Sequence, residues 1–215
     1  MKTILLKDAV ALIPDGATVM IGGFMGVGTP ERLVDELVRQ GKRNLTVIAN
    51  DNALPGIGIG KLISAGAVKK TIASHIGLNP ETQKKMLAGE LEVDLVPQGT
   101  LIERIRAGGF GLGGVLTPTG VGTVVEKGKQ RIEVEGKPYL LETALRADFA
   151  LVQAFLADYV GNLYYALTAR NFNPVMAMAA DTVIVDAENI VPVGVISPDQ
   201  VVTPAPVVDY IISHA

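Results

Sequence analysis

The first part of the chain alternates short apolar runs with segments whose apolar residues recur at helical spacing. Residues 18–21 have the composition of a buried strand, and the segment after Thr29 and Pro30 has the period of an amphipathic helix. We expect Thr29 to be the N-cap of this helix, Pro30 its first-turn proline and Gly41 its end. Its inner face is predicted to carry Leu33, Val34, Leu37 and Val38.

The same alternation of strand and helix continues to about residue 107. Further strands are predicted at residues 45–49, 70–74, 91–96, 149–154 and 182–185, and further helices after Gly60, between Asn79-Pro80 and Gly89, and at 98–107. This order is typical of an α/β protein with a mainly parallel sheet and helices on both faces, in which ligands bind at the carboxyl ends of the strands. We expect residues 1–215 to form a single domain.

The helical period disappears between Gly108 and Gly128. Glycines crowd this stretch, and residues 117–120 indicate a turn, so the pattern predicts either a long ordered loop or a β excursion. Residues 131–141 are predicted to form a hairpin that turns at Glu135-Gly136.

Composition removes several classes of function. The 19 Lys and Arg against 22 Asp and Glu give a formal net charge of −3, which offers no general basic field for nucleic acid. Charges such as Lys61 and Asp181 interrupt the apolar runs, so no membrane span is expected, and Lys7 and Asp8 end the N-terminal apolar stretch too early for a signal peptide. The chain has no cysteine, which excludes thiolate chemistry and agrees with a cytoplasmic protein.

The densest local signal is the segment from Asp15 to Pro30. It consists of a turn, a buried strand, a loop with four glycines and the start of a helix. Glycine allows positive φ and the close approach of a ligand, and a helix N-terminus offers N–H groups to an anion such as a pyrophosphate. On this chemistry alone, a tight turn in any Rossmann-like protein explains the segment equally well.

The order of residues in this segment resembles the α-side signature of the family I CoA-transferases. That signature is an apolar strand, Gly-Gly-Phe, three residues, Gly, one residue and Pro, and it is matched by Gly22, Gly23, Phe24, Gly28 and Pro30. The resemblance continues over nearly the whole chain, through residues 49–51, 74–77, 89–92, 97–101, 104–109, 117–120 and 169–173. It is closest to the α subunits that act on acetate, butyrate and acetoacetate.

The resemblance implies a CoA-transferase-like domain that exchanges CoA between a short-chain acyl-CoA and a short-chain carboxylate such as acetate, acetoacetate or butyrate. In the family, a glutamate of the β subunit attacks the thioester and then carries CoA as a glutamyl thioester, in a ping-pong reaction. The implied partner is that β subunit, in an α2β2 heterotetramer or a larger assembly, and the 48% hydrophobic content fits a sizeable interface. CoA is implied as a substrate, with no permanently bound cofactor and no metal.

The family's Ser-Glu-Asn-Gly motif around that glutamate is missing from this sequence. Residues 187–190 are the nearest match, but they contain neither the serine nor the glycine. We interpret them as a surface loop after a strand and assign Glu188 no catalytic role.

By the same resemblance, Gln98 and Asn50 line the acyl site as supporting catalytic residues. An amide side chain donates N–H groups to a developing oxyanion without adding a titrating charge. From the residues alone, a helix cap for Gln98 and a turn cap for Asn50 remain the alternatives. Asp51 departs from the Asn-Asn pair of the succinyl-CoA:3-oxoacid enzymes, which disfavours succinate. CoA binding is expected in the glycine-rich loop, at Phe24, Met25, Gly26, Val27, Gly28, Thr29 and Pro30.

Two further glycine motifs are weak. Residues 109–114 satisfy the dinucleotide fingerprint, but they precede a proline-containing turn instead of opening a helix. Gly60 and Lys61 resemble the end of a phosphate loop, although Pro55 and Leu62 occupy two positions that the motif reserves for other residues.

The remaining candidate side chains have structural interpretations. His75 and His214 are the only histidines, and His75 is expected to end a strand near the site without acting as a base. Arg104 and Arg106 could bind CoA phosphates, but we expect both to face solvent on a helix.

Two other classes of protein remain as alternatives. A sugar-phosphate isomerase or deaminase of the same broad fold would work alone and would carry its own acid/base pair, which the sequence does not reveal. A non-catalytic CoA-binding module would share the glycine-rich turn and would have no need of Gln98 and Asn50.

Overall fold

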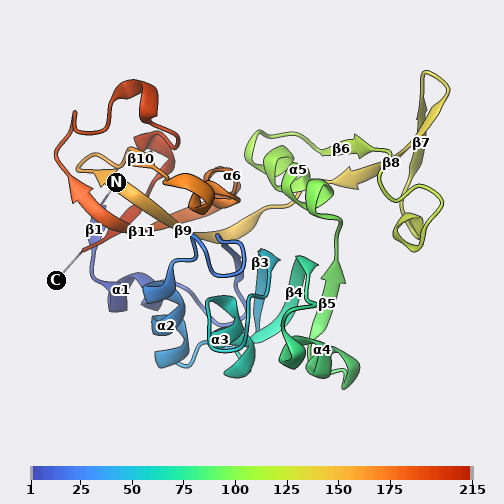
Figure 1. Cartoon of the computed structure of the whole chain (residues 1–215), viewed down its shortest axis with the longest axis horizontal. Coiled ribbons are helices and arrows are strands. Elements are labelled where there is room, and N and C mark those ends of the chain that lie inside the picture. Colours follow the sequence, from blue (N-terminus) through green and yellow to red (C-terminus); the bar gives the residue numbers. More distant parts are fainter. Residues whose placement is uncertain (1, 214–215) are drawn as a thin grey trace.

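The computed structural model describes residues 2–213 and is built around a nine-stranded sheet (Figure 1). Eight strands follow one path, and every neighbouring pair along that path is parallel. In spatial order they are β1 (Lys2–Ile4), β12 (Tyr210–Ile212), β11 (Ala180–Val191), β9 (Ala147–Asp158), β2 (Thr18–Ile21), β3 (Leu45–Asp51), β4 (Val68–His75) and β5 (Glu92–Leu95). The short β10 (Leu163–Tyr164) pairs antiparallel with β9.

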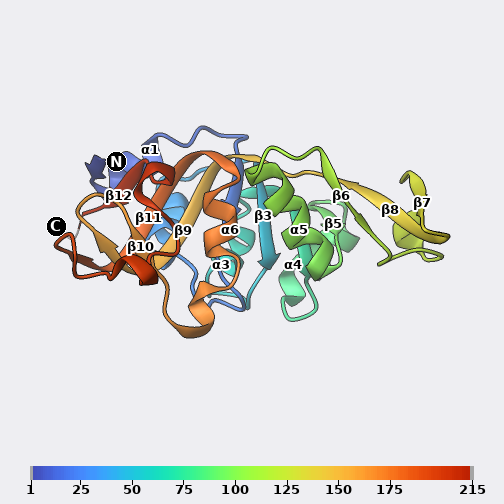
Figure 2. The ribbon, with the colours of Figure 1, turned by 90° about the horizontal axis from the view of Figure 1, so that it is seen from above.

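Helices cover both faces of this sheet, as the alternating pattern predicts (Figures 1 and 2). One face carries α1 (Leu6–Ala11), α2 (Glu31–Arg39), α3 (Ile59–Ser64) and α4 (Pro80–Leu87), and the other carries α5 (Gln98–Gly109) and α6 (Asn173–Ala177). Short 3₁₀ turns are η1 (Val124–Glu126), η2 (Leu167–Arg170), η3 (Pro198–Gln200) and η4 (Ala205–Val207). None of the helices within residues 2–213 is long and apolar enough to cross a bilayer.

The strand β9 shows why the central strands appear in the sequence as continuous apolar runs. Ala150 and Val152 face the core under α5 and α6, and Leu151 between them faces the core under α1, α2 and α3. All three side chains are fully buried. A strand that is buried on both faces needs apolar residues at every position, so the alternation that marks a half-exposed strand is lost.

The predicted helix starts are partly confirmed. Asn79 caps α4, because its side chain accepts a hydrogen bond from the Thr82 N–H at 3.0 Å, and Pro80 follows in the first turn. The prediction of Thr29 as the N-cap of α2 is wrong. Pro30 occupies that position, with φ −74° and ψ 78°, so the helix begins one residue later, at Glu31.

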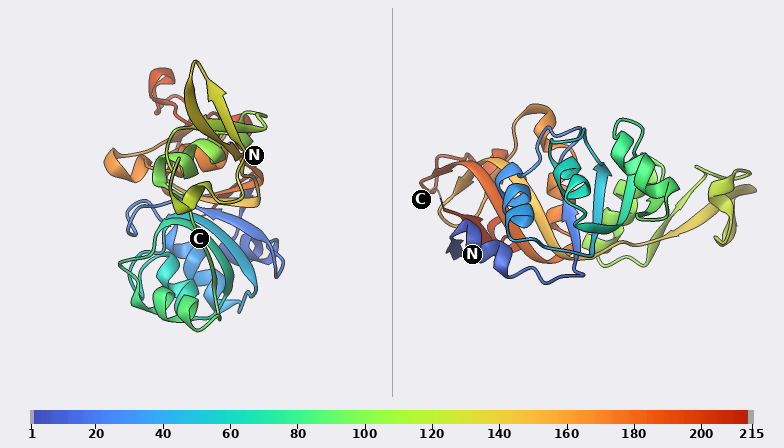
Figure 3. Two further views of the ribbon diagram at one scale, coloured as in Figure 1. Left: turned by 90° about the vertical axis from the view of Figure 1, so that its right-hand side faces the viewer. Right: turned by 90° about the horizontal axis from the view of Figure 1, so that it is seen from below.

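Residues 110–146 form an arm that extends from the body of the molecule (Figure 3). It contains a second sheet of β6 (Gly114–Thr117), β8 (Lys137–Thr143) and β7 (Arg131–Val134) in that order, all antiparallel. Of the two predicted possibilities for this segment, the β excursion is therefore the one realised. The predicted hairpin is confirmed, because Glu135 and Gly136 have φ of 51° and 73° and join β7 to β8.

Two sequence interpretations are wrong because tertiary contacts override them. Arg104 does not face solvent: its Nε donates to the Thr143 carbonyl at 2.7 Å, across the base of the arm. Arg106 is exposed as expected and pairs with Glu103 on its own helix. Glu188 lies within the long strand β11, not in a loop after a strand, because β11 continues to Val191 beside β9.

Candidate active site

Polar side chains meet where β3 and β4 end. Asn50 and Asp51 are the last two residues of β3, and Ser74 and His75 are the last two of β4. Asp51 and His75 are direct partners in the parallel register. Gln98, the first residue of α5, completes the group from the far side. The carboxyl edge of the sheet therefore gathers the amides, the carboxylate and the imidazole in one place.

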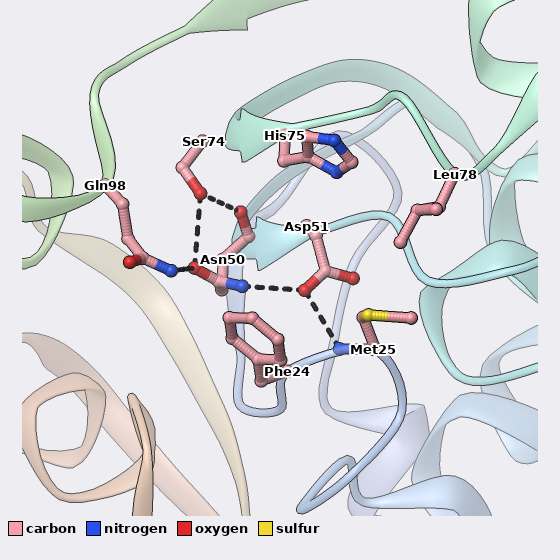
Figure 4. Close-up of a pocket in the computed structure, with 8 residues that line it drawn as sticks. All are labelled: Phe24, Met25, Asn50, Asp51, Ser74, His75, Leu78 and Gln98. Atoms are coloured by element: carbon pink, nitrogen blue, oxygen red, sulfur yellow. Dashed lines mark hydrogen bonds between the residues drawn. The ribbon is translucent and has the colours of Figure 1, made fainter.

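These residues line a cavity of about 390 Å³ (Figure 4). Its polar wall is formed by the strand ends and Gln98, and its apolar wall by Phe24, Met25 and Leu78. Within residues 2–213, no three His, Asp or Glu side chains lie together as a metal site would require.

Asn50 and Gln98, the two predicted catalytic residues, are in direct contact. The Gln98 Nε2 donates to Asn50 Oδ1 at 2.6 Å, and the Ser74 hydroxyl donates to the same oxygen at 3.2 Å and to the Asn50 carbonyl at 2.7 Å. The Asn50 side chain is 2% exposed, whereas Gln98 is exposed at the mouth of the cavity. The Gln98 amide thus turns toward Asn50 instead of capping its own helix.

Asp51 joins this amide pair to the glycine-rich loop. Its Oδ2 accepts hydrogen bonds from Asn50 Nδ2 at 2.7 Å and from the Met25 N–H at 2.9 Å, and its Oδ1 accepts from the Ala53 N–H at 2.7 Å. Figure 4 shows the carboxylate between the Asn50 amide and the loop. One buried side chain therefore contacts two walls of the cavity.

The loop itself is a tight turn with an exposed tip. Phe24 and Val27 exchange backbone hydrogen bonds at 3.0 and 2.9 Å, and between them Met25 and Gly26 have φ of 49° and 89°. The side chains of Phe24, Met25 and Val27 are 45%, 41% and 51% exposed. They also line a second, apolar hollow of about 710 Å³, which Thr168 and Asn171 complete.

Two asparagines that lie far away in the sequence hold the loop in place. Asn171 Oδ1 accepts from the Gly23 N–H at 3.2 Å and its Nδ2 donates to the Val27 carbonyl at 2.9 Å, while Asn173 Nδ2 donates to the Gly28 carbonyl at 2.9 Å. A Cβ at Gly22 would lie 1.7 Å from Asn173 Oδ1. Glycine is required there because the asparagine occupies the space of a side chain.

The seven residues predicted to bind CoA divide into two sets. Phe24, Met25 and Val27 are exposed at the tip of the loop, and Gly26 is half-buried beside them. Gly28, Thr29 and Pro30 are buried at its base, where they shape the loop from below.

Lys61 ends the incomplete phosphate-loop motif, and its side chain forms ion pairs within the fold. Its ammonium contacts Glu31 and Asp35 of α2, both at 2.6 Å. Burial acts to lower the pKa of Lys61, but the hydrogen bonds to Asp35 and Glu31 outweigh it and raise the pKa above its usual value. The lysine joins α3 to the start of α2, beneath the glycine-rich loop.

Sequence reasoning missed four residues of this arrangement. From the sequence, Asp51 served only to disfavour succinate as a substrate, and Ser74, Asn171 and Asn173 had no assigned role. Ser74 and Asp51 could have been found from their positions at strand ends. Asn171 and Asn173 have no local signal, because their partners lie more than 140 residues away. His75 ends its strand at the cavity, as expected, and His214 lies outside the described residues.

Comparison with known sequences identifies close relatives. A family model described as coenzyme A transferase matches residues 3–214. An acetate CoA-transferase subunit alpha of Escherichia coli (strain K12) is 58% identical, over 98% of this chain and 96% of that protein. The alpha subunit of an acetoacetyl-CoA:acetate/butyrate CoA transferase of Clostridium acetobutylicum is 54% identical, over 99% of this chain and 98% of that protein.

A solved structure has the same fold. An acyl-CoA transferase of Escherichia coli O157:H7, determined as a thioester complex with CoA, matches 98% of this chain with a TM-score of 0.87 and 24% identity. This chain spans 46% of that longer chain, so the fold corresponds to about half of it. Because the family model matches residues 3–214 and the predicted α/β fold is confirmed, the chain belongs to the coenzyme A transferase family of enzymes.

Proposed function

We propose that this chain is the α subunit of an enzyme that moves CoA between a short-chain acyl-CoA and a short-chain carboxylate, with acetate, acetoacetate and butyrate as the candidate acids. The observation that carries the proposal is the contact between Gln98 and Asn50 at the mouth of a cavity of about 390 Å³. Two neutral amides in such a place suit a reaction in which a carbonyl oxygen gains negative charge.

The nucleophile in this proposal comes from a β subunit. A glutamate carboxylate of the partner attacks the acyl thioester carbonyl, and the CoA thiolate leaves, which gives an acyl-glutamyl anhydride. The thiolate then attacks the glutamyl carbonyl and releases the first acid. The second acid attacks the glutamyl thioester in the same way, and the returning thiolate forms the new acyl-CoA and frees the glutamate. Each tetrahedral step places charge on an oxygen within reach of amide donors.

The roles proposed for this chain follow from exposure and hydrogen bonding. Gln98 and Asn50 are the supporting catalytic residues. The exposed loop residues Phe24, Met25 and Val27 contact CoA, and Gly26 allows its close approach, while Gly28, Thr29 and Pro30 shape the loop from its base. CoA is a substrate in this scheme, and no permanently bound cofactor or metal has a role in it.

We propose further that the chain works in the cytoplasm as part of an α2β2 or larger assembly, without nucleic acid or membrane as partner. Exposed apolar side chains on the loop and on segments near it support a protein interface there: Phe24, Met25, Val27, Leu54, Ile57, Leu78 and Leu167. Residues 1–215 are proposed to act as one domain.

The first experiment is an exchange assay with acetyl-CoA and acetoacetate, carried out on this chain alone and after mixing with the β subunit. Activity in the mixture and none in the chain alone is the expected result. Full activity of the chain alone would contradict the division of labour, because the chain would then carry its own nucleophile.

The substitution Gln98→Ala tests whether Gln98 supports catalysis in this cavity. Loss of one oxyanion donor lowers kcat by about 100-fold or more, and we expect a loss of this order in the mixed enzyme with an unchanged melting temperature. The matched control is Arg106→Ala, an exposed residue on the same helix, which should leave kcat near that of the parent. Normal turnover of the Gln98 variant would remove it from the site.

A further inference from the structure

Asp51 occupies the centre of the hydrogen-bond network at the cavity, and its own role follows from that position. It is 6% exposed and accepts from two backbone N–H groups and from the Asn50 amide. We propose that Asp51 is a positioning residue that sets the orientation of the Asn50 and Gln98 amides for acyl transfer. This inference rests on the proposed function of the cavity.

A carboxylate and an amide differ in the hydrogen bonds that they can make. An ionised carboxylate only accepts hydrogen bonds, whereas an amide side chain has a donating and an accepting end. Asn50 must therefore turn its Nδ2 toward Asp51, at 2.7 Å. In the reverse orientation, two acceptor oxygens would face each other at that distance, which is unfavourable.

The orientation is passed on to Gln98. With Nδ2 committed to Asp51, the Asn50 Oδ1 points the other way and accepts from Gln98 Nε2 and the Ser74 hydroxyl. Gln98 consequently holds its NH₂ group at the cavity side. One N–H binds Asn50, and the second remains for an oxygen of a substrate. An exposed glutamine has several rotamers of similar energy, so this hydrogen bond also limits its motion.

The same carboxylate fixes the opposite wall. Met25 and Ala53 both have φ of 49°, a conformation that costs a non-glycine residue free energy, and their N–H groups bind the two oxygens of Asp51. The tip of the glycine-rich loop and the pair of amides are therefore both held by hydrogen bonds to the Asp51 carboxylate. Their relative placement depends on Asp51 in both directions.

In this chain the donors around position 51 suit a carboxylate, and the asparagine that the succinyl-CoA:3-oxoacid enzymes carry there would not reproduce it despite its almost identical shape. All three donors approach Asp51, one at Oδ1 and two at Oδ2. An asparagine at position 51 would turn its NH₂ group toward at least one of these donors, whichever way it faced. The substitution Asp51→Asn thus disturbs orientation while it leaves volume almost unchanged.

The test uses the complete enzyme with its β subunit. We expect Asp51→Asn to lower kcat by about tenfold or more while KM for the acceptor carboxylate changes by less than about threefold, because the main effect is on a donor to the developing oxyanion. The control is Asp94→Asn on β5, which removes an exposed carboxylate and should leave both constants unchanged. A normal kcat for the Asp51 variant would overturn the inference.

A double-mutant cycle separates positioning from general damage. If Asp51 acts through the amides, then Asp51→Asn should lower kcat by a smaller factor in the Gln98→Ala background than in the parent. Multiplicative losses in the double variant would overturn the inference. If the Asp51 variant fails to assemble, Asn50→Ala takes its place in the cycle. This variant removes the side chain that connects Asp51 to Gln98 and leaves the contacts of Asp51 to the loop. Multiplicative losses of Asn50→Ala and Gln98→Ala would overturn the inference equally.

The outcomes also distinguish the inference from the function on which it rests. An unmodified complex without CoA-transfer activity would contradict the proposed function. An active complex whose Asp51→Asn variant has normal kcat would contradict only the role of Asp51.

Discussion

Asp158 is a buried carboxylate whose partners are all supplied by a single turn. It is 1% exposed at the end of β9, and its Oδ1 accepts from the N–H groups of Val160, Gly161 and Asn162 at 2.9 to 3.1 Å. Its Oδ2 accepts from Asn162 Nδ2 at 2.8 Å. Burial acts to raise the pKa of Asp158, but these hydrogen bonds outweigh it and hold the pKa below its ordinary value of 3.8.

The lowered pKa predicts a pH-dependent contribution to stability. A group whose folded pKa is depressed stabilises the fold above its unfolded pKa and loses that contribution as the pH falls through the folded value. We expect Asp158→Asn to lower the free energy of unfolding by about 1–3 kcal/mol at pH 7, with a difference that is constant down to about pH 5 and shrinks below 3.8. Urea denaturation of both proteins at pH 7, 5 and 3.5 measures this difference.

A control for this prediction is Asp199→Asn, which alters an exposed carboxylate in a turn. It should change stability little at any pH. A difference for Asp158→Asn that stayed the same from pH 7 to 3.5 would contradict the assignment of its effect to the charge.

At the scale of secondary-structure elements, the arm depends on a buried ion pair at its base. Glu142 on β8 is 2% exposed, and its carboxylate lies 2.5 Å from Lys129 Nζ and 3.9 Å from Arg104 Nε. The backbone is joined at the same place, because the Leu145 N–H donates to the Arg104 carbonyl at 2.9 Å. The arm is thereby fixed to α5, the helix that carries Gln98.

Loss of this charge should loosen the arm first. Glu142→Gln removes the carboxylate that pairs with Lys129 and lies near Arg104, so we expect it to speed amide hydrogen exchange in β6 and β8 while exchange in β9 and β11 stays slow. The control Glu133→Gln changes an exposed residue on β7 and should leave the exchange pattern unaltered. Equal acceleration in all four strands would show that Glu142 supports the whole fold and not the arm alone.

The elements themselves were largely predictable from local pattern. β2 has the predicted bounds, and β3, β4 and β5 lie within a few residues of them, because apolar runs bounded by Gly, Pro and Asn identify strands. The stretch from Gly108 to Gly128 could not be assigned to one of the two predicted possibilities, because it has no helical or strand period of its own: it contains β6, which pairs with β8, and the 3₁₀ turn η1. The cap of α2 was misplaced by one residue, as is common at helix ends.

At the scale of the whole molecule, strands from near the two ends of the chain pair at one edge of the same sheet. Lys2 of β1 pairs with Tyr210 of β12, and β9 stands between β2 of the first half and β11 of the second. The two hydrophobic cores lie on opposite faces of this shared sheet. Neither half of the sequence therefore has a complete sheet by itself.

This shared sheet predicts cooperative unfolding of residues 1–215, as a single domain requires. Calorimetry of the full chain should give one transition whose calorimetric and van't Hoff enthalpies agree. Far-UV and near-UV circular dichroism should give the same midpoint. Two resolved transitions, or an enthalpy ratio well above one, would contradict the single domain.

The candidate site divides in the same way between local and global information. Strand ends and a family signature single out Gln98 and Asn50 in the sequence, and the structure brings these two side chains into contact. Asp51 could be located but not interpreted, since the hydrogen bonds of its carboxylate depend on which donors surround it. The clamps Asn171 and Asn173 were not predictable, because no periodic pattern connects them to the loop that they hold.

The sequence by itself determined the order and type of most elements, the parallel α/β class and the family, because these depend on hydrophobic period, turn residues and short motifs that act over a few positions. Only the tertiary structure decided that β9 separates β2 from β11 and that Asn171 reaches Gly23 across 148 positions. It also decided that Asp51 faces three donors at once. The physical reason is that side-chain hydrogen bonds act over about 3 Å in space, at any separation along the chain.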